Sequence, residues 1–429
     1  TGAILLPNLA WAQNCSCATE TLSGNFKISE HPNKSFTNVS YCLDGTLVID
    51  ENTVMHNCTL FAKTPSSKII VVNTKTLTVE SSSVLRGCNN KWAGVDVQTG
   101  GKIIFEGSTI QNADIGLLLE TGSARCEVVN SQILDNGVGI QVGSTGAFHK
   151  NMISPFSGNT FSTLASGNLQ AALVELKLKG VVSAIIAKNS DNHFLNSYVG
   201  IESEKTNLTI LDGSFSDIKE DQAVGPETGM GIISKKWGTL TVESCDFNNC
   251  GANGILSNGD QSVKVSGSTF TGCKINGVNV LSTNFGVDPN GAAISGGVDI
   301  NYNTFEMPGS GELSAISVVR PYFATKSYIR QNTINASGIK SGVEGFIKVV
   351  SGVSGALVAD GSFVIDNNTI NNAATGSAAG IVITGLNTGS GILANGYQIS
   401  NNHITYNASG LADLAENHAI RVIGVAGAN

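Results

Sequence analysis

Three carboxylates stand at one recurring place in the chain. Asp50, Glu80 and Glu106 each precede an apolar residue by four positions. The apolar residues at this spacing are Val54, Val84 and Ile110. If successive units of the chain stack, the acids form one outward column, where like charges raise each other's pKa unless a cation lies between them. Because Ca²⁺ takes carboxylate oxygens, the column predicts a calcium site. The alternative is an exposed strand edge whose acidic side chains splay into water.

Two other stretches combine basic and aromatic residues, which together can hold a sugar ring or an acidic polymer. Lys235 and Trp237 follow a charged insertion at 219–231. The second stretch contributes Arg320, Tyr322 and Lys326. Both stretches are candidate ligand-binding loops, and the alternative for both is a solvated loop. The histidines are scattered without metal-ligand spacing, so the sequence assigns no catalytic residue and no other cofactor.

One sequence motif repeats along the chain: a small polar residue, a spacer and then one Ile or Phe, as in FVIDNNTINN (363–372). Alignment on the closing residue gives these anchors: Val54, Val84, Ile110, Ile133, Phe161, Phe194, Phe215, Phe247, Phe270, Phe305, Ile334, Ile370 and Ile404. Their spacings run from 21 (215 − 194) to 36 (370 − 334), and the short ones cluster at 21–26. The stretch before an anchor often alternates apolar and polar residues, which indicates a strand. Units of about 22 residues with short strands and Gly or Asn turns are typical of a parallel β-helix.

Asn or Ser stands two positions before most anchors. In the C-terminal half these residues are Asn303, Asn332, Asn368 and Asn402. In stacked coils they would form one column at a tight bend, since Asn tolerates left-handed backbone and its amide can bond to the amides above and below. The motif is therefore interpreted as an asparagine ladder, with the following Ile or Phe turned inward.

These repeats resemble the right-handed parallel β-helix superfamily, the pectate-lyase-like group, over roughly residues 45–425. The stretch LRGCNNKWAGVDVQTGGKIIFEGSTIQNADIGL (85–117) looks closest to secreted bacterial surface domains of this group. The resemblance implies either a surface protein or a polysaccharide lyase or hydrolase. Lyases of this fold typically hold Ca²⁺ with acids and use a Lys or Arg as base. The polygalacturonase and pectate-lyase motifs are absent from this sequence.

The expected fold is all-β: a single right-handed parallel β-helix of about 13 coils over 45–429, with loop insertions. Residues 13–44 are expected to cap its first coil. Residues 1–12 resemble the end of a secretory signal peptide, with a small-x-small cleavage site before Gln13, or else form an apolar cap.

The repeat register also places the cysteines. Cys58 and Cys88 each lie four residues after successive anchors, and Cys250 and Cys273 each lie three after theirs. Because stacked residues are about 4.8 Å apart, each pair is predicted to be neighbours, either as a disulfide or as packed thiols. Cys245 falls in the polar column and is expected to be buried and free. The cap holds Cys15, Cys17 and Cys42.

Composition narrows the choice of function. The formal charge of −8 argues against a nucleic-acid binder, and no run reaches the roughly 18 apolar residues of a membrane span. The first hypothesis is a secreted or cell-surface bacterial protein without catalytic activity, with a structural, adhesive or glycan-binding role. Its partners would be polysaccharides or other surface proteins, and open strand edges could allow end-to-end self-association.

The alternative is an extracellular polysaccharide lyase or glycoside hydrolase that acts in a groove on the outer face, and it rests on fold analogy. A flat, uncharged face favours the first hypothesis. A Lys or Arg that faces two or more acids across adjacent coils favours the second.

Overall fold

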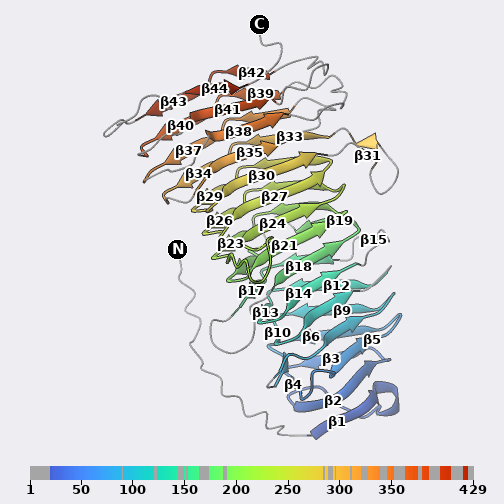
Figure 1. The fold of residues 1–429 in the computed structure, drawn as a ribbon. Helices are drawn as coiled ribbons and strands as arrows, with labels where there is room; N and C mark the ends of the chain where they lie inside the picture. Colours follow the sequence, from blue (N-terminus) through green and yellow to red (C-terminus); the bar gives the residue numbers. More distant parts are fainter. Residues whose placement is uncertain are drawn as a thin grey trace.

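The chain folds as a rod of stacked strands with the N-terminal coils at one end and the C-terminal coils at the other (Figure 1). The structure, a computed structural model, describes residues 20–88, 90–119, 123–143, 149–150, 153–163, 173–186, 191–283, 286–287, 293–294, 296–309, 312–319, 327–338, 345–351, 363–374, 379–385, 397–406 and 419–423. The expected signal-peptide remnant at 1–12 lies outside these residues. In the described part, no helix is long and apolar enough to cross a membrane.

The strands form three long faces, named here face 1, face 2 and face 3, and each strand pairs in parallel with its equivalents in the neighbouring coils. Face 1 contains β4 (Thr59–Ala62), β7 (Val84–Gly87), β10 (Thr109–Gln111), β13 (Gln132–Leu134), β17 (Thr160–Ser162), β20 (His193–Leu195), β23 (Ser214–Ser216), β26 (Asp246–Asn248), β29 (Thr269–Thr271), β34 (Thr304–Met307), β37 (Thr333–Ala336), β40 (Thr369–Asn372) and β43 (His403–Tyr406). Face 2 contains β5 (Lys68–Val71), β8 (Gly94–Val97), β11 (Ile115–Leu119), β14 (Val138–Val142), β18 (Val174–Lys179), β21 (Val199–Glu204), β24 (Met230–Lys235), β27 (Asn253–Asp260), β30 (Asn276–Thr283), β35 (Ser314–Val319), β38 (Gly345–Ser351), β41 (Ala379–Gly385) and β44 (Ile420–Ile423).

Face 3 is divided into two sheets. The first contains β3 (Thr53–His56), β6 (Thr76–Glu80), β9 (Lys102–Glu106), β12 (Arg125–Val129) and β16 (Ile153–Ser157). The second contains β15 (His149–Lys150), β19 (Val181–Ile186), β22 (Asn207–Leu211), β25 (Thr239–Glu243), β28 (Ser262–Ser266), β33 (Gly297–Asn301), β36 (Ser327–Arg330), β39 (Phe363–Asp366) and β42 (Tyr397–Ser400). An antiparallel pair, β31 (Gly286–Val287) and β32 (Ala293–Ile294), lies outside the faces.

The N-terminal end of the rod is formed by β1 (Glu20–Lys27), a short 3-10 helix η1 (Ile28–Glu30) and β2 (Ser40–Ile49). β1 pairs in parallel with β2 along its whole length. β2 then runs through a corner, since its first half pairs with β4 of face 1 and its second half with β5 of face 2.

The core is built from the inward rows of the three faces. Phe161, Phe194, Phe215, Phe247, Phe270 and Phe305 stack along face 1 with ring centroids 4.7–4.9 Å apart. Each is at most 2% exposed, and each pairs with the next in register. Because offset parallel rings at this spacing add to the area that they bury, the stack stabilises successive coils against one another. The predicted inward anchors are thus confirmed from Ile110 onward.

The predicted asparagine ladder is present. Asn303, Asn332 and Asn368 each donate a side-chain hydrogen bond of 2.9–3.0 Å to the side-chain oxygen of the next member, ending at Asn402. That oxygen also accepts the backbone N–H of the preceding member. The left-handed residue of the bend is not the ladder asparagine but the one before it, such as Gln331 and Asn367, with φ 55° and 53°.

The first two predicted anchors are wrong. Val54 is 52% exposed and belongs to face 3, where it pairs with Thr78. The inward residue of the first full coil on face 1 is Leu60, which pairs with Leu85 and not with Val84. The register is therefore shifted by six residues in the first unit (60 − 54) and by one in the second (85 − 84).

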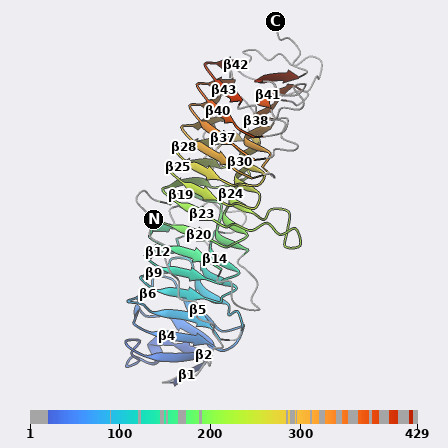
Figure 2. The ribbon, with the colours of Figure 1, turned by 90° about the vertical axis from the view of Figure 1, so that its left-hand side faces the viewer.

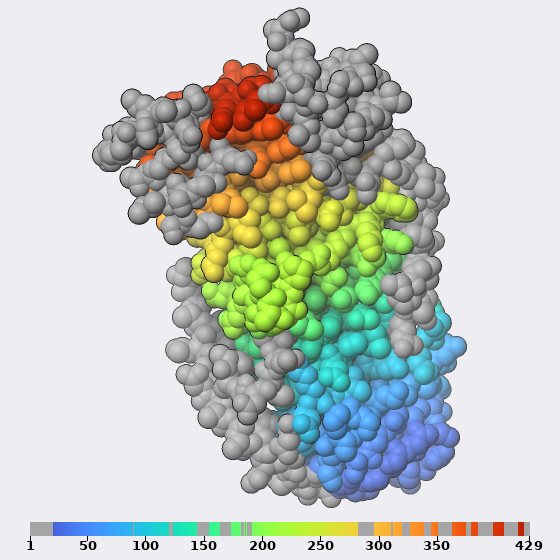
Figure 3. All heavy atoms as spheres, viewed as in Figure 1, coloured from blue at the N-terminus to red at the C-terminus, as the bar shows by residue number. Residues whose placement is uncertain are grey.

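One long loop is prominent on the outside of the rod. The segment 217–229 projects from the strands and is drawn in yellow-green in Figures 2 and 3. It leads into β24, where Met230 joins Val199, Ile233 and Leu256 in a small apolar cluster separate from the main core. Several outward residues of face 2 are therefore shielded from water in these coils.

Candidate functional site

The corrected register removes Asp50 from the predicted calcium column and leaves Glu80 and Glu106 in it. Glu80 and Glu106 lie at equivalent places in β6 and β9, but the residue beneath Glu80 is His56. His56 Nδ1 is 3.0 Å from Glu80 Oε1. Asp50 follows β2 on face 2, where its carboxylate accepts the backbone N–H of Ser29 at 2.9 Å. No group of three His, Cys, Asp or Glu side chains within the described ranges could hold a metal ion.

The structure describes two of the five predicted ligand-binding residues. Lys235, at the end of β24, forms ion pairs with Glu227 and Glu202, and its side chain is only 16% exposed. Trp237 is 56% exposed on the corner that follows β24. Lys235 is thus ion-paired with neighbouring acids, whereas the ring of Trp237 is exposed to solvent. The other three, Arg320, Tyr322 and Lys326, lie outside the described residues.

The cysteines divide into bonded and free groups. Cys58 is a buried free thiol, whereas Cys88 is disulfide-bonded, so the predicted pair of Cys58 and Cys88 is wrong both as a disulfide and as packed thiols. The register error at the first two anchors explains this failure. Cys250 and Cys273 are neighbours, as predicted, and are packed thiols rather than a disulfide. Cys245 is buried and free in the ladder column, where it accepts the backbone N–H of Gly213 at 3.4 Å.

A cluster of charges that sequence reasoning missed lies at the corner between faces 1 and 2. Lys91 stands among Asp114, Asp135 and Glu175, which come from successive coils. Its Nζ approaches Gly137, since a Cβ placed on that glycine would lie 3.4 Å away. Burial lowers the pKa of the Lys91 amine, and the three acids oppose that shift. A lysine that loses its proton more easily than usual can act as a base or nucleophile.

Glu175 is the unusual member of this corner cluster. It is 1% exposed, and neither carboxylate oxygen has a hydrogen-bond partner among the described residues. Burial raises the pKa of Glu175 well above its usual range, Asp135 raises it further, and Lys91 lowers it. A carboxyl in such surroundings is held in its neutral, proton-donating form.

The place of Glu175 in the repeat is occupied by glycine in the neighbouring coils, at Gly139 below and Gly200 above. Glycine is required because a Cβ at Gly200 would lie 2.7 Å from the Phe215 ring. The sequence signal that marks Glu175 is therefore its position before Leu176, where other coils carry a Gly followed by an apolar residue.

A family comparison agrees with this architecture. The family model described as the right handed beta helix region matches residues 23–161. Beyond the match, the parallel pairing of all three faces continues to β42, β43 and β44. The chain folds as a right-handed parallel β-helix. A search of curated proteins finds no match to it. The family indicates a surface or an enzymatic role for this β-helix.

Face 1 of the β-helix carries two straight rows of polar groups on its outer side. The first row is Thr269, Thr304, Thr333 and Thr369, which pair in register and are all partly exposed. The second row is Glu306, Asn335 and Asn371, joined by side-chain hydrogen bonds of 2.7 and 2.9 Å. Because coils stack at about 4.8 Å, the rows offer hydroxyl and amide groups at a regular spacing.

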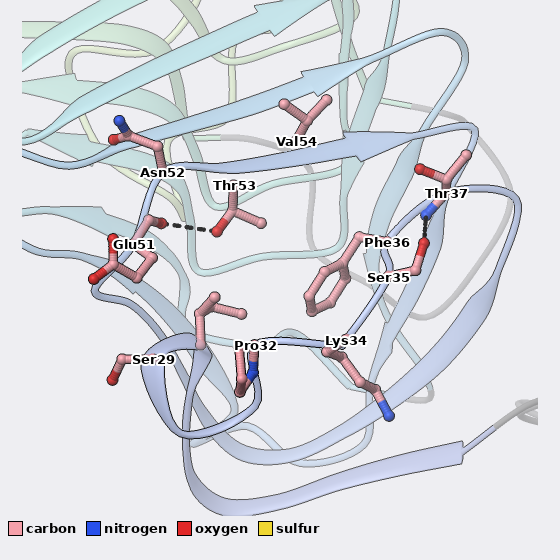
Figure 4. A pocket seen from close by; sticks show the side chains of 11 residues that line it. Ser29, Pro32, Lys34, Ser35, Phe36, Thr37, Glu51, Asn52, Thr53 and Val54 are labelled. Carbon is pink, nitrogen blue, oxygen red and sulfur yellow. Dashed lines mark hydrogen bonds between the residues drawn. The ribbon is translucent and has the colours of Figure 1, made fainter.

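A pocket of about 550 Å³ lies at the N-terminal end of the β-helix, between β3 and the segment 28–37 (Figure 4). Phe36 and Val54 contribute apolar surface to it, and Lys34 and Glu51 contribute charge. Lys34 pairs with Glu20, and Glu51 with Lys75, so both charges are already matched by partners. The pocket therefore shows no group that awaits a charged ligand.

Proposed function

We propose that the protein is an extracellular, surface-associated rod that binds an extended polysaccharide along face 1 without cleaving it. The observation that carries this proposal is the pair of polar rows formed by Thr269–Thr304–Thr333–Thr369 and Glu306–Asn335–Asn371. Hydroxyl and amide groups both donate and accept hydrogen bonds, as sugar hydroxyls do. A polymer lying along the rod would meet the same groups at every coil, so that many weak contacts add up.

Further support comes from the chemistry around the rows. Asn335 and Asn371 are held in place by their mutual hydrogen bond, so little side-chain freedom is lost when a ligand binds. The disulfide-bonded state of Cys42 and Cys88 fits an oxidising compartment outside the cytosol. The exposed ring of Trp237 offers a stacking surface on another corner of the rod.

The test is retention of the protein on a panel of neutral and acidic polysaccharides, with and without Ca²⁺. We expect the double variant Thr304→Val and Thr333→Val to bind about tenfold more weakly, because two hydroxyls are replaced by methyl groups of the same shape. The matched control is Thr209→Val with Thr241→Val, which makes the same change on paired, partly exposed residues of face 3. Equal retention of the two double variants would refute binding along face 1.

A second candidate function, polysaccharide cleavage, is favoured by the corner cluster. Lys91 and the acids Asp114, Asp135 and Glu175 lie across adjacent coils, with an amine whose pKa is lowered and a carboxyl whose pKa is raised, in both cases chiefly by burial. That pair has the chemistry of a base and an acid. Release of reducing ends or unsaturated products, abolished by Lys91→Met while retention persists, would establish cleavage.

A further inference from the structure

A second buried acid lies in the middle of the rod, far along the chain from the corner cluster. Asp260 ends β27 and is fully buried. Its Oδ2 accepts the Ser257 hydroxyl at 2.6 Å, and its Oδ1 has no hydrogen-bond partner within the part of the chain that the structure describes. A half-satisfied carboxylate inside a core is costly, whereas the neutral acid is much less so.

The surroundings of Asp260 are polar but uncharged. Ser203, Ser234 and Ser257 stand in register in β21, β24 and β27, and all three are buried. Ser203 donates to the Ser234 hydroxyl at 3.0 Å, which continues the row toward Asp260. A row of hydroxyls can reverse its direction, because each one both donates and accepts. The row can therefore serve the ionised carboxylate as a donor and the neutral acid as an acceptor.

Among the residues that the structure describes, no charged group compensates the Asp260 carboxylate. The groups that face it are the Ser234 side chain from β24, the Ser257 side chain from its own strand and the Gly238 backbone N–H before β25, while Thr283 is its register partner in β30. Lys235, at the end of β24, forms ion pairs with Glu202 and Glu227. Lys236, on the following corner, forms an ion pair with Glu204. Burial raises the pKa of Asp260 to about 6, and the hydrogen bond from Ser257, together with the nearby Ser234 hydroxyl and Gly238 N–H, limits the rise.

We propose that Asp260 is a protonation switch inside the rod: its carboxyl takes up a proton when these coils fold, so that the middle of the β-helix is held more tightly in acid than at neutral pH. The sign follows from linkage, since the folded state binds more protons than the unfolded one between the two pKa values. The contribution of Asp260 is complete below its unfolded pKa near 3.8 and is lost as the pH rises to about 6. The total change corresponds to about 100-fold in the local opening equilibrium, tenfold for each pKa unit.

The test is hydrogen exchange of the full chain, followed by mass spectrometry between about pH 4 and pH 8. Peptides covering β24 and β27 are compared with peptides covering β6 and β9, which cancels the intrinsic effect of pH on exchange. In the wild type we expect protection of β24 and β27, relative to β6 and β9, to fall about 100-fold over this range. In Asp260→Asn the relative protection should stay constant. Asp246→Asn, which alters an exposed acid in β26, should behave as the wild type.

Two further measurements keep the proposal open to refutation if Asp260→Asn folds poorly. Ser257→Ala removes a donor to the carboxylate, so loss of protection should extend to higher pH than in the wild type. The infrared difference spectrum between acid and neutral pH should contain the band of a buried protonated carboxyl that is lost near pH 6, and the band should be absent from Asp260→Asn. Identical pH profiles for the wild type and both variants, or a carboxyl ionised well below pH 6, would overturn the proposal.

Discussion

The side-chain amide of Asn332 donates to the side-chain oxygen of Asn368 at 2.9 Å, and the same oxygen accepts the backbone N–H of Asn332 at 3.1 Å. Asn368 in turn donates to the backbone oxygen of Ile329 at 2.9 Å. One side chain therefore satisfies three groups of the coil below. The ladder is a substitute for backbone pairing at a bend where the strands themselves are interrupted.

This arrangement predicts a large effect from a single substitution. Asn368→Ala should lower the free energy of unfolding by roughly 2–4 kcal/mol, because it leaves several buried donors and acceptors unpaired. Asn371→Ala is the control, since Asn371 belongs to the outer row and its neighbours can bond to water. Denaturant unfolding measures both variants, and similar losses would contradict the structural role of the inner ladder.

A second prediction concerns the glycines at the corner between faces 1 and 2. Gly200→Ala should cost about 1–3 kcal/mol, because the new methyl group would lie 2.6 Å from the Gly231 backbone oxygen and 2.7 Å from the Phe215 ring. Gly225→Ala should be close to neutral, since nothing lies within 4 Å of its Cβ position. Thermal unfolding of the two variants compares the positions directly. An unchanged Tm for Gly200→Ala would show that the backbone at this corner shifts to accept the methyl group at little cost.

The corner acid gives a prediction for pH dependence. Burial raises the pKa of Glu175, so its folded state holds a proton that the unfolded state releases above the ordinary value of 4.5. Stability contributed by this group is therefore lost as the pH rises through the folded pKa. Glu175→Gln should unfold at higher denaturant concentration than the wild type at alkaline pH, and the difference should shrink in acid. A difference independent of pH would show that Glu175 is ionised in the folded protein.

Thiol labelling tests the assignment of the cysteines. Cys58, Cys126, Cys245, Cys250 and Cys273 are free and buried. Burial raises the pKa of Cys58 and Cys245 to about 12, which leaves almost no reactive thiolate at neutral pH. We expect none of the five to be alkylated in the folded protein and all five after unfolding without reductant. Cys42 and Cys88 should react only after reduction, and their labelling in its absence would contradict the bonded state.

Much of the architecture could be predicted because the repeat encodes it locally. From Ile110 onward an inward Ile or Phe recurs at every coil, in most coils two positions after Asn or Ser, and the pairing follows these residues without a slip. The first coils break the pattern. There Asn52, just before β3, and Val54 within it mimic the motif on another face, while the true ladder position is occupied by Cys58 instead of Asn or Ser.

The corner cluster could not be predicted from the sequence, for a different reason. Lys91 and Glu175 are 84 residues apart in the chain (175 − 91), and they approach only because the coils between them stack. The spacing of 33 between Phe161 and Phe194 also obscured the register around Glu175. Contacts across several coils depend on the whole stack, which no local pattern contains.

The parallel pairing of the three faces has a mechanical consequence. Hydrogen bonds between coils run along the axis of the rod, and a terminal coil is paired on one side only, so a pull on the two chain ends would detach the terminal coils first. The molecule would lengthen by releasing one coil after another at a modest force. If such a rod is anchored at one end and binds a polymer along its side, shear would unfold its coils gradually before the polymer dissociates.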